Sequence, residues 1–279
     1  MTPPGVRRAI AVCILALSGC SSALPALTFS AGPGAEPLPA VQRSAPDDPY
    51  LVRLRAEHAL DAVVAGAGTD LDRVRRLSAW TRSRWDHNGF NEPSAPDPLT
   101  ILAEAAAGQR FRCVEYAVVL AGALNAVGVP ARVLGLKTAD VETRALGAGH
   151  VVAEAYLADL GRWVMVDGQF DFIPVLDGEP LSALDLQGAL ATRPGDVAFE
   201  RLSEGGISPG RYRRFIGPYL YYFDVRLDQR YTAGGDRDRR LLTLGPVGAP
   251  MPTVFQRTSP MGPQVYTHSA AAFYAAPAL

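Results

Sequence analysis

The stretch 112–167 combines one helical pattern with three strand patterns, and it constrains the fold more than any other part of the chain. Apolar residues recur at helical spacing over 112–127, and Gly128 follows directly, as is typical of a helix end. Candidate strands follow at 131–137, 150–157 and 162–167, the last two joined by a short turn. Because short connections join elements that are neighbours in space, we expect an antiparallel sheet packed against this helix, which is an α+β fold.

Two polar residues can meet across this expected sheet. Side chains alternate between the two faces of a strand, so pairing Tyr156 with Trp163 would set Asp167 diagonal to His150 and within side-chain reach. A shift of one residue would turn Asp167 to the other face. The pattern alone leaves this register open.

The N-terminus has the layout of an export signal. Arg7 and Arg8 precede an apolar run over 9–17, and no acidic residue occurs before Cys20. The residues 17–20, Leu-Ser-Gly-Cys, resemble the lipobox of bacterial lipoproteins, which implies acylation of Cys20 and anchoring to a membrane of the cell envelope. An ordinary signal peptide that ends near a cysteine is the alternative.

The cysteines single out one thiol. Cys13 would leave with the signal peptide and Cys20 would be acylated, so Cys113 would be the only free thiol of the mature protein. It falls in the first turn of the expected helix, where unpaired backbone N–H groups and the helix dipole favour a thiolate. Burial as an inert core residue is the alternative.

Several pieces of this region stand in an order typical of one enzyme family. They are Cys113 at a helix start, the run 124–132, His150 with Glu154 four residues on, and the run 163–167. Together they resemble the transglutaminase-like superfamily of cysteine enzymes over about residues 70–172. The resemblance implies a papain-like core with Cys113 as nucleophile, His150 as base and Asp167 orienting the imidazole.

Two positions depart from the pattern of that family. Phe111 stands two residues before the nucleophile, where glycine is common, and Val152 stands two after the histidine, where an aromatic residue is common. Neither departure removes a reacting group. They motivate one alternative, a non-catalytic peptide-binding module.

Other residues are candidates for supporting roles. Gln109 is the candidate side-chain donor of the oxyanion hole, beside the backbone N–H of Cys113, although an exposed loop role is at least as plausible. Trp85 and Asn88 are candidates for the wall of the cleft. An aromatic cluster is either a peptide-binding wall or ordinary strand packing: Tyr219, Tyr221, Tyr222 and Phe223.

Composition and spacing argue against several partners. The chain has 27 Lys and Arg against 28 Asp and Glu, a net charge of −1, so a nucleic-acid partner is not expected. None of His58, His87 and His268 has a second ligand at metal spacing, and we expect no metal and no cofactor. No apolar run is long enough to span a membrane in the mature chain.

We expect four parts along the chain: a lipoprotein signal peptide at 1–20, a flexible tether of about 30 Å at 21–48, a transglutaminase-like domain at 49–240 and an extended C-terminal arm at 241–279. Further helices are expected at 51–64, 71–85 and 181–190, and a strand at 219–227.

The expected function is that of an exported, lipid-anchored enzyme. It would act on peptide or protein amides in the cell envelope through a Cys113 thioester. Hydrolysis is favoured because water is abundant there, and a transglutaminase that forms amide cross-links is the first alternative.

Overall fold

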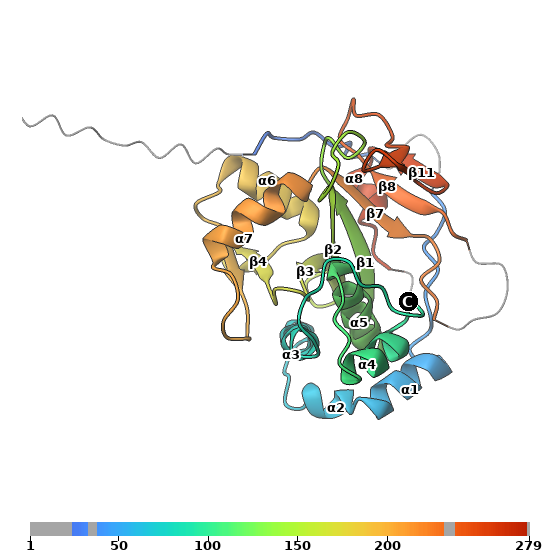
Figure 1. Cartoon of the computed structure of the whole chain (residues 1–279). Helices are drawn as coiled ribbons and strands as arrows, with labels where there is room; N and C mark the ends of the chain where they lie inside the picture. The colour runs from blue at the N-terminus through green and yellow to red at the C-terminus, as the bar shows by residue number, and fades with distance from the viewer. Residues whose placement is uncertain (1–23, 33–37, 232–237, 278–279) are drawn as a thin grey trace, which may run out of the picture.

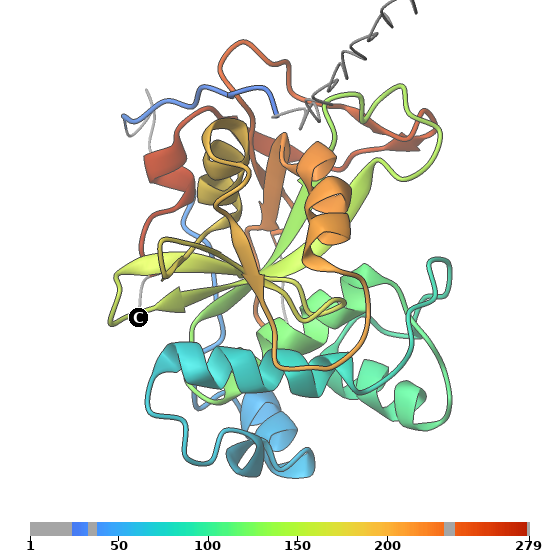
Figure 2. The same cartoon turned by 90° about the vertical axis from the view of Figure 1, so that its left-hand side faces the viewer.

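A six-stranded sheet runs through the middle of the molecule and carries helices on both faces (Figures 1 and 2). The computed structural model describes residues 24–32, 38–231 and 238–277. Neighbouring strands of the sheet are antiparallel except β11 and β8, which are parallel. In spatial order the strands are β11 (Gln264–Thr267), β8 (Leu241–Leu244), β7 (Tyr222–Arg226), β1 (Ala131–Lys137), β2 (Gly149–Leu157) and β3 (Arg162–Val166).

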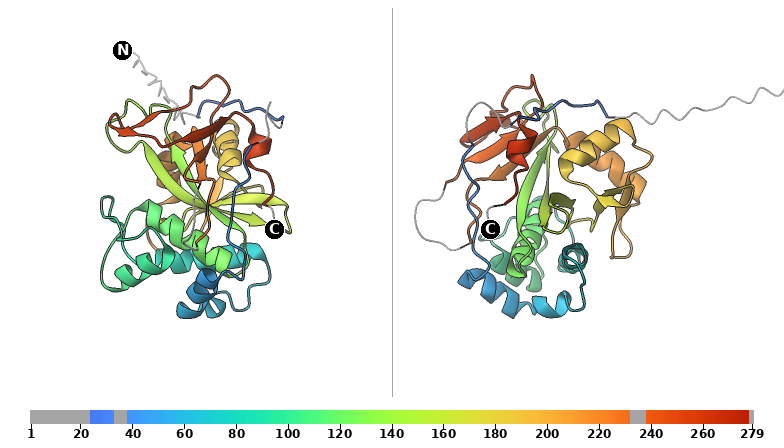
Figure 3. Two further views of the ribbon diagram at one scale, coloured as in Figure 1. Left: turned by 90° about the vertical axis from the view of Figure 1, so that its right-hand side faces the viewer. Right: turned by 180° about the vertical axis from the view of Figure 1, so that it is seen from behind.

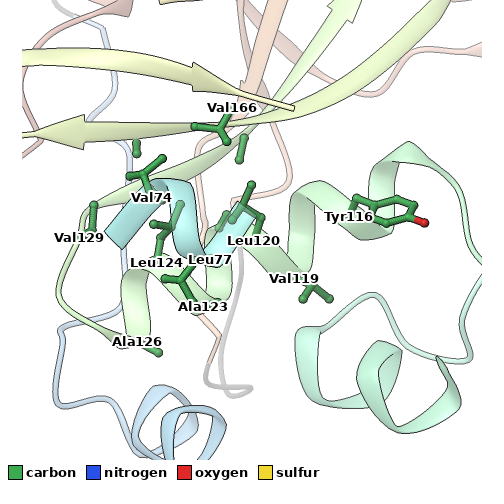
Figure 4. Packing of buried hydrophobic residues seen from close by; sticks show 14 of the residues in the cluster. Val74, Leu77, Tyr116, Val119, Leu120, Ala123, Leu124, Ala126, Val129 and Val166 are labelled. Atoms are coloured by element: carbon green, nitrogen blue, oxygen red, sulfur yellow. The ribbon is translucent and has the colours of Figure 1, made fainter. Parts of the chain in front are cut away.

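Five helices cover one face of this sheet. The central one is α5, the helix expected at 112–127, and its burial is nearly complete because helices and strands surround it. Val74 and Leu77 of α3 lie against Leu120 and Leu124 of α5, with Val166 of β3 above them (Figure 4). The five are α1 (Pro49–Glu57), α2 (Leu60–Val63), α3 (Asp70–Arg82), α4 (Pro98–Ala106) and α5 (Cys113–Ala126).

The opposite face carries α6, α7 and a small sheet. Val152 of β2 packs there, whereas its neighbours Ala153 and Ala155 face α5, which is the alternation expected of a strand. The elements on this face are β4 (Ile173–Leu176), β5 (Glu179–Pro180), α6 (Ala183–Thr192), β6 (Ala198–Glu200), α7 (Pro209–Ile216) and the 3₁₀ turn η1 (Gly217–Tyr219). The remaining elements are the hairpin of β9 (Val254–Phe255) and β10 (Ser259–Pro260), and the helix α8 (Ala270–Phe273).

The fold class expected from the sequence, a cysteine-bearing helix on an antiparallel sheet, is confirmed. One helix boundary differs. The helix expected at 51–64 is broken into α1 and α2, because Ala59 adopts a left-handed backbone with φ 47°. Leu54 and Leu60 are both buried, and six residues apart they would not share a face of one continuous helix. The break turns both side chains into the core.

The segment 21–48 is not a free tether where the structure describes it. The backbone N–H of Ser30 donates to His268 (N···O 2.7 Å), and that of Gln42 donates to Leu227 (2.7 Å). Phe29 packs against the second hydrophobic cluster, so an apolar side chain and backbone hydrogen bonds hold this segment, for which composition alone indicated a coil. It runs beside the C-terminal strands in Figure 3.

The C-terminal part is likewise more than an arm laid over the body. β8 and β11 are strands of the central sheet, and β8 pairs with β7 from Phe223↔Leu244 to Arg226↔Leu241. A domain boundary between residues 240 and 241 would divide this sheet, so that expectation is wrong. The strands are only four residues long, which makes their periodicity too short to recognise in the sequence.

The expected signal peptide at 1–20, with Cys20, lies outside the described residues. Of the helices that the structure describes, none has the length and apolar character needed to cross a membrane.

Candidate active site

Three elements bring the predicted triad to one end of β2. Cys113 is the first residue of α5, His150 is the second residue of β2, and Asp167 directly follows β3. The strand register, which the sequence left open, sets Tyr156 opposite Trp163 and so brings the last two together. The short turn between β2 and β3 therefore determines how the imidazole and the carboxylate meet.

The imidazole of His150 is bound to the carboxylate of Asp167. Nε2 lies 2.7 Å from Oδ2, and the two side chains are 3% and 0% exposed. The other oxygen, Oδ1, accepts the backbone N–H groups of Gln169 (3.0 Å) and Phe170 (3.3 Å). Oδ2 also accepts the hydroxyl of Tyr212 (2.7 Å). The buried carboxylate thus has four donors, which satisfies a charge that would otherwise be costly to bury.

The thiol of Cys113 is hydrogen-bonded to His150 and to the backbone N–H of Val151. Because Nε2 is engaged by Asp167, Nδ1 is the ring nitrogen left for the sulfur. Burial alone would raise the pKa of Cys113, but the hydrogen bond and positive charge of His150, together with the Val151 N–H, outweigh burial and lower it. The thiol of Cys113 therefore loses its proton more readily than an ordinary cysteine thiol.

The pKa of His150 is shifted in the opposite direction to that of Cys113. Burial favours its neutral form, yet the charge and hydrogen bond of Asp167, followed by Cys113, raise the pKa of His150 to about 10. A lowered thiol pKa beside a raised imidazole pKa favours a thiolate–imidazolium pair at neutral pH. Such a pair is the reactive form of a cysteine nucleophile.

Aromatic rings enclose the imidazole. Phe215 meets it edge to face at 5.0 Å between ring centroids, Tyr219 lies at 5.9 Å and Phe170 at 6.2 Å. Phe215 and Tyr219 come from α7 and η1, on the opposite face of the sheet from α5. These rings limit the access of water to the His150–Asp167 pair.

A cavity of about 450 Å³ is lined in part by Phe170, whose ring also contacts the His150 ring. Its walls come from the end of α3, the turn after Asp167 and the loop 203–207. Burial, followed by the nearby charge of His150, lowers the pKa of His87 in its wall. Lining residues include Arg82, His87, Gln169, Phe170, Ser203 and Glu204.

The supporting residues expected from the sequence have mixed positions. Gln109 is exposed, and its side-chain oxygen accepts a hydrogen bond from Asn91 (3.3 Å), so its role in an oxyanion hole stays a prediction. Trp85 is 7% exposed and packs against Phe111 and Tyr116, which makes it a core residue. Asn88 is exposed and holds its own turn through Oδ1.

The two departures from the family pattern are packing residues. Phe111 and Val152 are both fully buried, the first against Trp85 and the second beside α6 and α7. Of the expected aromatic wall, Tyr219 borders the imidazole, whereas Phe223 is buried in the core.

Tyr212 and Phe215 are the residues that the sequence did not reveal. Tyr212 lies 45 residues after Asp167, in a helix separated from it by several elements. No local pattern links a helical tyrosine to a distant aspartate, and the only signal was an aromatic residue on an amphipathic helix.

One stretch of the chain matches a known family model. Residues 57–168, which include Cys113, His150 and Asp167, match the model of the transglutaminase-like superfamily. No curated protein matches the chain. The match covers the three elements that supply the candidate triad, and α7 lies beyond it.

Solved structures with low identity are also similar to this chain. One is described as a candidate cysteine protease from Cytophaga hutchinsonii, with a TM-score of 0.36 and 13% identity over 62% of this chain and 56% of that one. Red sea bream transglutaminase has a TM-score of 0.35 and 14% identity over 72% of this chain and 38% of that one. Nocardia farcinica arylamine N-acetyltransferase has a TM-score of 0.32 and 16% identity, covering 66% and 79%. The chain thus spans about half the length of the first of these proteins.

Proposed function

We propose that this chain, in which residues 57–168 form a transglutaminase-like core, is a cysteine enzyme that acts on peptide or protein amides through a thioester at Cys113. The observation that carries this proposal is the hydrogen-bonded line from Cys113 through His150 to Asp167. Each member has the state that the chemistry requires: a thiol with lowered pKa, an imidazole with raised pKa and a buried carboxylate.

The reaction proceeds in two steps. The Cys113 thiolate attacks the amide carbon, the imidazolium of His150 gives its proton to the leaving amine, and a thioester remains. His150 then takes a proton from an incoming water or amine, which attacks the thioester and expels the thiolate. Asp167 keeps the imidazole oriented and stabilises its positive charge in both steps.

Hydrolysis is the favoured outcome. The cavity next to Phe170 has exposed residues in its wall, including Glu204 and Gly205, so it is open to water. Amide transfer needs a site that admits an amine in preference to water. Transglutaminase activity is therefore the alternative outcome of the test below.

The test is turnover of casein with a fluorescent primary amine present. We expect the wild type to release ammonia or new peptide ends, and Cys113→Ala and His150→Ala to release neither. His58→Ala is the control, because His58 packs on Trp80 away from the site. Incorporation of the amine would identify a transglutaminase. Binding of casein without turnover, unchanged by Cys113→Ala, would reject the enzyme in favour of a peptide-binding module.

For its location we propose export and anchoring at Cys20, with substrates in the cell envelope. This proposal is supported by the sequence of residues 1–20. A lipid anchor at Cys20 would hold the candidate site near a membrane surface.

A further inference from the structure

The two carboxylate oxygens of Asp167 accept hydrogen bonds from different kinds of donor. Oδ1 accepts two backbone N–H groups from the turn that follows Asp167. Oδ2 accepts the Nε2–H of His150 and the hydroxyl of Tyr212, both at 2.7 Å. The oxygen that faces the imidazole is therefore shared with a side chain from α7, a helix beyond the family core.

Tyr212 is held firmly in this position. It is 0% exposed, and its ring packs against Phe172 (4.7 Å), Phe199 (5.1 Å) and Phe170 (5.4 Å). Ser208 caps the start of α7 by accepting the N–H of Arg211, which fixes the helix one turn before the ring. The ring cannot turn away without opening this aromatic cluster.

Tyr212 is a constant donor. Burial, followed by the negative charge of Asp167, raises the pKa of Tyr212 well above its ordinary value. Its hydroxyl thus stays protonated at any working pH and gives a hydrogen bond without exchanging a proton in the reaction.

We infer that Tyr212 is a positioning residue that shares the charge of Asp167 Oδ2, so that Asp167 orients His150 without drawing the proton from its Nε2. A second donor on the same oxygen weakens the pull of the carboxylate on the Nε2 proton. An imidazolium held less tightly is a stronger acid toward the leaving amine, and proton donation to that amine is its task in the first step. For its kinetic readout the inference rests on the proposed function.

The test is Tyr212→Phe, which removes the hydroxyl and keeps the ring. We expect kcat to fall by about tenfold with KM unchanged, because one hydrogen bond to a charged group is lost away from the substrate. The proton NMR resonance of the His150 Nε2–H, assigned by its absence in His150→Ala, moves further downfield as the carboxylate pulls harder. Tyr222→Phe is the matched control, since this buried hydroxyl donates to the carbonyl of Pro250 (3.0 Å) instead.

The His150 Nε2–H resonance tests the role of Tyr212 independently of the proposed enzymatic function. If the wild type turns over no amide, the proposed function fails, while the shift of the Nε2–H resonance still tests Tyr212. An unmoved resonance in Tyr212→Phe, or an equal shift in Tyr222→Phe, overturns the inference. If Tyr212→Phe does not fold, fluorotyrosine at position 212 replaces it, because it keeps the hydroxyl and makes it a stronger hydrogen-bond donor. We then expect the Nε2–H resonance to move upfield. A resonance that does not move would overturn the inference.

Discussion

At the scale of single residues, His150 decides the state of Cys113. Burial works against the thiolate, and the influences that overcome it come from the imidazole and from the Val151 N–H. The imidazole is able to do this because Asp167 keeps it charged. The reactivity of the cysteine is therefore a property of the three side chains together, and the helix start alone does not account for it.

This dependence predicts the pH profile of Cys113 alkylation by iodoacetamide. The thiolate is the reactive form, so the wild type reacts at half its maximal rate at a pH below 9.0, the ordinary pKa of the thiol. In His150→Ala burial is no longer opposed by the imidazolium, and the midpoint moves to higher pH. The measurement is the second-order rate constant as a function of pH. His58→Ala should behave as the wild type; a midpoint that ignores His150 would contradict the ion pair.

At the scale of elements, the loop 201–207 completes the cavity next to Phe170. Asp171, which has a positive φ of 55°, accepts the backbone N–H groups of Leu202 (3.0 Å) and Ser203 (2.7 Å). Arg201 closes the loop by donating to the carbonyl of Ile207 (3.2 Å). The turn after Asp167 thus holds the wall of this cavity in place.

We expect a change in the cavity wall to affect a large peptide substrate but not a small alkylating reagent. Ser203→Trp places a large ring in the cavity wall, and KM for a peptide substrate should rise by about tenfold or more, since cleft contacts are lost. Alkylation of Cys113 by the small iodoacetamide should keep its wild-type rate. Leu202→Trp, at an exposed neighbour that does not line the cavity, is the control. Equal effects of the two variants on KM would show that the peptide binds elsewhere.

At the scale of the whole molecule, both ends of the described chain close on the central sheet. The C-terminal end covers the buried ion pair of Arg132 and Glu154 (2.6 Å). Arg132 donates to the carbonyl of Phe273 (2.9 Å), and the hydroxyl of Tyr274 donates to Glu154 (3.1 Å). The C-terminal residues thus satisfy charges in the middle of the fold, and removing them would leave a buried pair with fewer partners.

Phe273→Ala should therefore destabilise the protein by about 3–5 kcal/mol. Phe273 is 2% exposed and its ring stacks under the Arg132 guanidinium at 4.7 Å, so its loss leaves both a cavity and a less protected ion pair. Urea unfolding measures the change. Val247→Ala, at a side chain that is 57% exposed, should stay within about 0.5 kcal/mol of the wild type. A small effect of Phe273→Ala would mean that α8 is not part of the folded body.

The packing of the N-terminal segment changes what an anchor at Cys20 would do. Leu24 lies in the second hydrophobic cluster, so three residues separate Cys20 from the body, a reach of about 14 Å when extended. The enzyme would lie close against the membrane. We expect the wild type, expressed in a bacterium, to require detergent for extraction, and Cys20→Ala to be released without it. Cys13→Ala should behave as the wild type, and release of the wild type by a salt wash would argue against acylation.

The sequence alone predicted most of the elements around the candidate triad, although it missed the break at Ala59 and the strands β8 and β11. Helical spacing and strand alternation act over a few residues, so local patterns predicted the elements that carry Cys113, His150 and Asp167, and the family resemblance implied their roles. The meeting of His150 and Asp167 depends on the register between β2 and β3, which the sequence left open and the structure supplies.

Only the tertiary structure decided what surrounds them. Tyr212 on Asp167, the loop 201–207 beside the cavity and the paths of residues 24–48 and 241–277 all depend on contacts between distant parts of the chain. These contacts satisfy buried polar groups that are far apart in the sequence. Those groups are buried only once the sheet has formed, so local sequence patterns do not reveal the contacts. Local periodicity predicts most of the elements of this protein, and the need to satisfy buried polar groups determines how distant elements contribute to its candidate site.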